Sequence, residues 1–154
     1  MKGYSENEFE TFFAAETEAT LKQCFEKGGN ITLFPKGTSM LPTIVQGKDS
    51  VVLSKCEKIT KNGIYLFKRP NGEFALHRLI KIKGENLIFC GDAQLVCESV
   101  EKKQLLAFVC GIYREGKRKD TRFSLKAFVF LNSFFPLRKL IIRFRSLSKR
   151  IKKG

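Results

Sequence analysis

Ser39 and His77 are the residues of this sequence whose types suit nucleophilic catalysis. Ser39 lies in the stretch 36–43, between Gly37 and Pro42, with an apolar run on either side. A serine hydroxyl is a poor nucleophile unless an adjacent base takes its proton. The chain contains a single histidine, His77, and a histidine titrates close enough to neutral pH to serve as that base. On these residues alone, an ordinary surface turn at Ser39 and a structural role for His77 remain the alternatives.

Two acidic residues follow His77 and could orient its imidazole. Asp92 comes directly after Gly91 at the end of an apolar run, and Glu98 follows six positions later. An acid beside a catalytic histidine fixes the tautomer and stabilises the imidazolium that forms during the reaction. The order serine, histidine, acid permits a triad without establishing one, because a triad is defined by geometry.

Four short boxes occur in a fixed order along roughly residues 30–112. They are Gly37-x-Ser39-Met40-x-Pro42-Thr43, Gln46-Gly47-Lys48-Asp49-Ser50-Val51-Val52, Leu76-His77-Arg78-Leu79-Ile80 and Gly91-Asp92-Ala93. Together they resemble the sequence boxes of the signal peptidase I and LexA-like serine peptidases. Four boxes in order are far more specific than any one of them, because single short motifs often match by chance.

The resemblance implies roles for the acidic residues and for the pair Ser39 and His77. Ser39 would be the nucleophile and His77 the base, as in the endoplasmic-reticulum and sporulation-type branch, where histidine replaces the lysine of the bacterial enzymes. Asp92 matches the family's Gly-Asp pair, and Glu98 occupies the place of a further acid about six residues on. The substrate would be a peptide or protein, with no cofactor. The residues implied to bind it are Gly37, Thr38, Met40 and Pro42.

The sequence departs from the family pattern in three places. The strand before the histidine box usually opens with Gly-Asp, whereas this chain has Asn62-Gly63. Some members carry a serine two residues before the nucleophile to help hold the oxyanion, and that position here is Gly37. We therefore expect backbone donors, including the Ser39 amide, to hold the oxyanion. From this sequence we also expect no N-terminal membrane anchor of the kind that family members carry.

Composition indicates one domain of 154 residues. The five cysteines, an odd number, form no CxxC or Cys/His cluster, which gives no indication of a metal site and favours reduced thiols in a cytosolic compartment. The sequence shows neither a signal peptide nor a clear transmembrane span, which favours a cytoplasmic or peripheral membrane location.

The sequence predicts a mainly β protein with a helix at its N-terminus. Residues 5–27 begin with a capping-box pattern and end at Gly28, and residues 1–29 are expected to pack on the core. The remaining pattern, residues 30–113, predicts a β-rich peptidase core with an antiparallel sheet or partly open barrel, in agreement with the coiled β fold that the resemblance implies. The expected strands are 31–35, 50–54, 63–69, 73–83, 86–90 and 105–113.

Most of the net charge of +14 lies in the tail, residues 114–154. Residues 125–137 are mostly apolar, and the segment beginning at Pro136 alternates aliphatic and basic residues at helical spacing. Such a basic amphipathic pattern is typical of a membrane-surface element. We expect residues 125–154 to bind an anionic membrane surface, the alternative being a core-packing helix with a basic solvated face.

Three classes of function are compatible with these features. The first, which we favour, is a signal-peptidase-like serine endopeptidase. The second is a LexA-type self-cleaving regulator, but the first 30 residues are too short for a helix-turn-helix. The third is a non-enzymatic membrane- or nucleic-acid-binding module. Nucleic acid is the less favoured partner, because the tail's basic residues are interleaved with aliphatic ones rather than forming a phosphate track.

Overall fold

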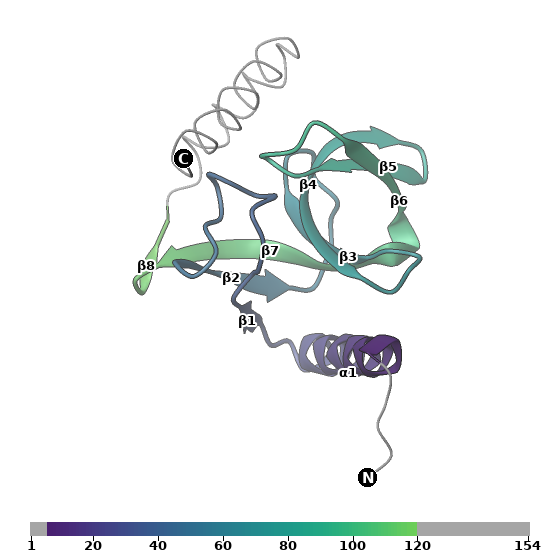
Figure 1. Cartoon of the computed structure of the whole chain (residues 1–154), viewed down its shortest axis with the longest axis horizontal. Coiled ribbons are helices and arrows are strands. Elements are labelled where there is room, and N and C mark those ends of the chain that lie inside the picture. Colours follow the sequence, from purple (N-terminus) through teal and green to yellow (C-terminus); the bar gives the residue numbers. More distant parts are fainter. Residues whose placement is uncertain (1–5, 120–154) are drawn as a thin grey trace.

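The computed structural model describes the backbone of residues 6–119 and the side chains of residues 16–119. This part of the chain is a mainly antiparallel β protein with one N-terminal helix (Figure 1). The elements, in chain order, are α1 (Glu6–Glu26), β1 (Ile31–Leu33), β2 (Asp49–Ser54), β3 (Ile64–Lys68), β4 (Phe74–Lys83), β5 (Asn86–Cys90), β6 (Cys97–Glu101), the short 3₁₀ helix η1 (Lys102–Gln104), β7 (Leu105–Arg114) and β8 (Lys117–Arg118).

The strands form one open antiparallel sheet. Its order is β1-β2-β7-β3-β4-β5-β6, with β8 paired to β7, so β1 and β6 lie at opposite ends of this order. The strand register shifts between Val52 and Leu53, between Leu66 and Phe67, and between Leu79 and Lys81. Because such irregularities bend a strand and increase its twist, β3 to β6 curl round into a ring-like half of the sheet (Figure 1).

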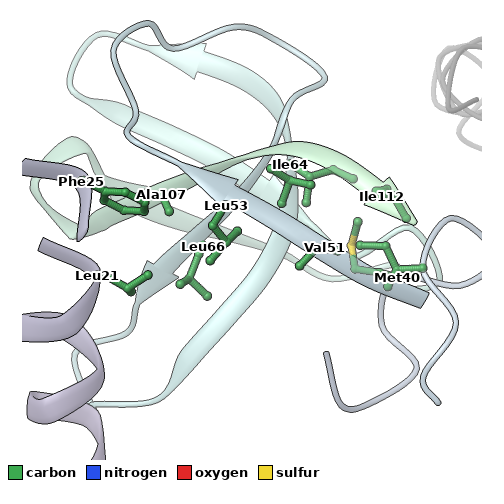
Figure 2. Close-up of a cluster of buried hydrophobic side chains, with 11 residues drawn as sticks. Leu21, Phe25, Met40, Val51, Leu53, Ile64, Leu66, Ala107 and Ile112 are labelled. Atoms are coloured by element: carbon green, nitrogen blue, oxygen red, sulfur yellow. The ribbon is translucent and has the colours of Figure 1, made fainter. Parts of the chain in front are cut away.

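Strand β3 separates two hydrophobic cores. Ile64 and Leu66 belong to the first core, whereas Tyr65 and Phe67 belong to the second, as expected for side chains that alternate along a strand. The first core joins helix α1 to the sheet through Leu21 and Phe25, together with Met40, Ile44, Val51, Leu53, Ala107, Val109 and Ile112 (Figure 2). The second fills the concave side of the curled half and includes Ala75, Leu79, Leu87, Phe89 and Val100.

A tight hairpin joins β3 to β4. The Asn71-Gly72 pair predicts this turn, and the structure confirms it, with Gly72 at a φ of 90° that favours glycine. The Arg69 amide donates a hydrogen bond to the Glu73 carbonyl at 2.8 Å, and the Gly72 amide donates to the Arg69 carbonyl at 2.9 Å. The hairpin therefore fixes the backbone of Arg69 next to the curled half of the sheet.

The predicted helix and all six predicted strands are confirmed to within about two residues at each end. Two short strands, β6 and β8, were not predicted. The sheet is open, and none of the described helices is long and apolar enough to cross a membrane. The predicted membrane-binding segment, residues 125–154, lies outside the described residues.

Candidate active site

Strand β4 presents His77 and Arg78 on opposite faces of the sheet. His77 pairs with Tyr65 in the register of β3 and β4, and its ring lies 6.0 Å from the ring of Phe67, centroid to centroid. Both neighbours belong to the second core, so the imidazole lies on the concave face, where only 4% of His77 is exposed. Arg78 follows directly along the strand and therefore points the other way.

Glu98 reaches His77 from the edge strand β6. It pairs with Phe89 in the register of β5 and β6, which places its side chain on the concave face as well. The Nδ1 atom of His77 lies 2.6 Å from Oε1 of Glu98. An ionised carboxylate only accepts hydrogen bonds, so Nδ1 carries the proton and donates. The lone pair of the neutral imidazole then lies on Nε2, the nitrogen that a general base uses.

Arg69 holds the other side of the Glu98 carboxylate. Its Nε donates to Oε2 at 2.8 Å and one terminal nitrogen donates to Oε1 at 3.0 Å. The other terminal nitrogen donates to Glu73 at 3.1 Å. Sequence reasoning did not find Arg69, because its partner lies 29 positions away on a strand that was not predicted.

Burial and these contacts set the charge states of His77 and Glu98. Burial lowers the pKa of His77 from its ordinary 6.5, and this outweighs the raising effect of the neighbouring Glu98. Burial alone would raise the pKa of Glu98, but the hydrogen bonds and charges of Arg69 and His77 lower it below its ordinary value. At neutral pH the pair is therefore a neutral imidazole beside an ionised carboxylate.

Ser39 is held by the loop between β5 and β6. The Ala93 amide donates to the Ser39 carbonyl at 2.8 Å. A Cβ atom at Gly91 would lie 2.7 Å from the same carbonyl oxygen, so the close approach of the loop requires glycine. On the other side, Met40 is buried in the first core and anchors the turn that carries Ser39.

Asp92 does not contact His77 through a hydrogen bond but binds Arg78 on the opposite face. The guanidinium of Arg78 donates to both oxygens of Asp92, at 2.8 and 2.7 Å, and the Thr43 hydroxyl donates to the same carboxylate. Arg78 also donates to the Asn62 carbonyl at 2.8 Å. The two acids predicted for the site are thus separated: Glu98 meets His77, while Asp92 joins strand β4 to Thr43, four residues after Ser39.

Ser39 and His77 line one pocket of about 210 Å³. No hydrogen bond joins the Ser39 hydroxyl to His77, whose side chain contacts Glu98 instead. Catalytic hydrogen bonds are often long before substrate binds. The other lining residues are Pro35, Lys36, Gly37, Met40, Ile44, Arg69, Phe74, Ala75, Leu76 and Gln94.

Of the four predicted substrate-binding residues, two line this pocket and two do not. Gly37 lines it with a φ of 94°, and its amide donates to the side chain of Gln46 at 2.7 Å. Met40 also lines it, although only 4% of the residue is exposed. Thr38 and Pro42 are exposed and lie outside the pocket lining.

Within residues 16–119, no group of three or more His, Cys, Asp or Glu side chains could hold a metal ion, and all five cysteines are free thiols.

Comparison of the chain with protein-family models and with curated proteins found no match. The site holds a hydroxyl, a neutral imidazole and an ionised carboxylate, which are the groups that acyl transfer through a serine requires.

Proposed function

We propose that this protein is a serine endopeptidase of the signal-peptidase-like type, with Ser39 as the nucleophile, His77 as the general base and Glu98 as the orienting acid. The observation that carries the proposal is the 2.6 Å contact between His77 Nδ1 and Glu98, made on the wall of a pocket that Ser39 also lines. The contact leaves Nε2 as the basic nitrogen, and the pocket is the place where a peptide could meet both groups.

The reaction follows from the protonation states. When a peptide carbonyl binds beside Ser39, His77 Nε2 takes the hydroxyl proton as the oxygen attacks the carbonyl carbon. The imidazolium then gives this proton to the leaving amine, which breaks the C–N bond and leaves an acyl ester on Ser39. A water molecule attacks the ester in a second cycle in which His77 is again the base. Glu98 stays ionised throughout and stabilises the imidazolium.

The tetrahedral oxygen needs hydrogen-bond donors at the nucleophile turn. Gly37 offers no side-chain hydroxyl, so we assign this task to backbone amides, with the amide of Ser39 the first candidate. The 2.8 Å bond from Ala93 to the Ser39 carbonyl holds the turn in place, so the amides need little reorganisation during the reaction.

Peptide cleavage tests the proposed activity. The purified full chain is incubated with a mixture of peptides of varied sequence, and new termini are identified by mass spectrometry. We expect internal cleavages that disappear in Ser39→Ala and persist in the matched control Ser99→Ala, an exposed serine on β6. Internal cleavage by Ser39→Ala at the wild-type rate would contradict the assignment. If wild-type chain cuts only itself, a LexA-type regulator is the better interpretation.

We also propose that residues 125–154 attach the enzyme to an anionic membrane surface. The support is the sequence pattern alone, because the segment lies outside the described residues. Each basic residue near an anionic leaflet contributes about 1 kcal/mol, and salt screens this attraction. Insertion of phenylalanine side chains into the lipid would add a hydrophobic contribution that salt does not remove. The segment has four such residues, Phe128, Phe130, Phe134 and Phe135.

Co-sedimentation with vesicles tests the attachment. The full chain is expected to bind phosphatidylglycerol vesicles more strongly than phosphatidylcholine vesicles, and to bind less, though still measurably, at high salt. A chain ending at Asp120 is expected to stay in the supernatant. Equal sedimentation of the two chains would contradict the attachment. Displacement of the full chain from the vesicles by duplex DNA would contradict it as well.

A further inference from the structure

The Glu98 carboxylate lies between one imidazole and one guanidinium. Its Oε1 atom contacts both His77 Nδ1 at 2.6 Å and Arg69 at 3.0 Å, and its Oε2 atom accepts from Arg69 Nε at 2.8 Å. The side chain of Glu98 is 28% exposed and belongs to an edge strand. Without the two bonds from Arg69, the contact with His77 would be left to orient the carboxylate.

Arg69 is well suited to hold a carboxylate in one orientation. A guanidinium is planar and donates through two nitrogens in a fixed geometry, which a lysine ammonium cannot reproduce. Its backbone is fixed by the β3–β4 hairpin, and Glu73 binds its remaining terminal nitrogen at 3.1 Å. The backbone and the guanidinium of Arg69 are thus both held in place, and two of its nitrogens donate to Glu98.

We propose that Arg69 is a positioning residue, which holds Glu98 against His77 and shares the negative charge of the carboxylate. The inference rests on the proposed function, because it assigns Arg69 to the same catalytic group. Arg69 touches neither Ser39 nor His77 through a hydrogen bond and acts through Glu98.

The sharing of charge has a consequence for the imidazole. Three charged groups affect the pKa of His77: Glu98 from β6 and Asp92 from the β5–β6 loop raise it, and Arg69 from the hairpin lowers it. Removal of Arg69 eliminates a nearby positive charge and leaves the whole negative charge of Glu98 to His77. Both changes favour the imidazolium, so the pKa of His77 should rise.

The single histidine makes this shift directly measurable in the full chain. The imidazole resonances of His77 are followed by NMR from pH 4 to 9 in wild type, Arg69→Met, Glu98→Gln and the double variant. We expect Arg69→Met to raise the pKa by about half a unit or more and Glu98→Gln to lower it. In the Glu98→Gln background the Arg69→Met shift should be smaller, since only the direct effect of the Arg69 charge on His77 remains. A shift of equal size in both backgrounds, or no shift, overturns the proposal.

Lys68→Met is the matched control, because it removes a positive charge from the preceding residue, whose partner is Glu18 at 2.9 Å. We expect it to leave the His77 pKa unchanged, and a shift as large as that of Arg69→Met overturns the proposal.

If Arg69→Met does not fold, Arg69→Lys is used instead, because it keeps the positive charge but loses the two-nitrogen geometry of the guanidinium. It is expected to lower kcat about tenfold at nearly constant KM, and an unchanged kcat overturns the positioning role.

The NMR titration does not depend on peptidase activity, so the two proposals fail separately. Cleavage that depends on Ser39, combined with an unaltered His77 pKa in Arg69→Met, overturns only the role of Arg69. A His77 pKa that follows the predicted pattern in a chain without cleavage overturns only the proposed reaction.

Discussion

His77 and Arg78 are neighbours on strand β4, and each contacts a carboxylate, yet the two contacts differ in burial. The side chains of Arg78 and Asp92 are 4% and 2% exposed, and the two groups bind each other through two hydrogen bonds. Glu98, the partner of His77, is 28% exposed, and the imidazole lies on a pocket wall. Neighbouring residues of one strand thus carry a buried ion pair on one face and, on the other, an imidazole at a pocket wall that we propose to be the general base.

Peptide cleavage should be lost when either proposed reacting group, Ser39 or His77, is removed. Ser39→Ala, His77→Ala and the double variant are each expected to lose about a thousandfold or more of kcat/KM, and to similar extents, because members of such a unit are strongly non-additive. The rates of peptide cleavage by the three variants and the wild type measure these losses. A His77→Ala variant that retains most of its activity would falsify the assignment of the base.

Substitution at the Arg78–Asp92 ion pair, on the opposite face, should lower the free energy of unfolding. Asp92→Asn leaves the buried Arg78 without its ionised partner, which costs about 3 kcal/mol or more. Urea unfolding measures the loss. Glu85→Gln is the control, because it breaks an exposed ion pair with Lys102 that is worth less than about 1 kcal/mol. If Asp92→Asn unfolds at the wild-type urea concentration, the ion pair does not stabilise the fold.

Glu98→Gln should act mainly on rate. The amide cannot stabilise the imidazolium and can present its NH₂ group to Nδ1, which favours the wrong tautomer, so kcat should fall about a hundredfold or more. The free energy of unfolding should change less than in Asp92→Asn, because Glu98 is partly exposed. A stable Glu98→Gln variant with full turnover, beside a folded but inactive Asp92→Asn, would exchange the roles of the two acids.

The pH dependence of cleavage sharpens the contrast between the neighbours His77 and Arg78 on β4. His77 must be neutral to act as a base, whereas an arginine side chain has no hydrogen-bond acceptor for that role. Because burial lowers the pKa of His77 below 6.5, kcat/KM should rise through an acidic limb below pH 6.5 and then level off. A limb near pH 8.5 or above would instead indicate a lysine base, such as Lys81 or Lys83.

The sequence predicted the fold well wherever a strand carries a run of apolar residues or ends in a distinct turn. The Asn71-Gly72 turn and the apolar run of β3 are examples. Strand β6 was missed because Val100 is its only buried residue and two of its five residues are glutamates. Its place in the sheet comes from pairing with β5, and β propensity within the segment does not predict such pairing.

The candidate site was predictable in its residue types but not in its pairings. Ser39 and His77 follow from the lone histidine and the motif boxes, and the structure places both on one pocket. The choice between Asp92 and Glu98 depends on which face of the curled sheet each acid reaches, and strand register decides that. Arg69 could not be predicted as a site residue, because its proposed role depends on a contact with Glu98, which lies 29 positions away on β6.

The most direct test of the proposed catalytic group is covalent labelling of Ser39. The full chain is treated with a fluorophosphonate, which reacts with activated serines, and the labelled residue is mapped by tandem mass spectrometry. We expect the label on Ser39 in wild type, no label in Ser39→Ala, and labelling at least about a hundredfold slower in His77→Ala. A label on another residue, or His77→Ala labelled at the wild-type rate, would contradict the claim that His77 activates Ser39.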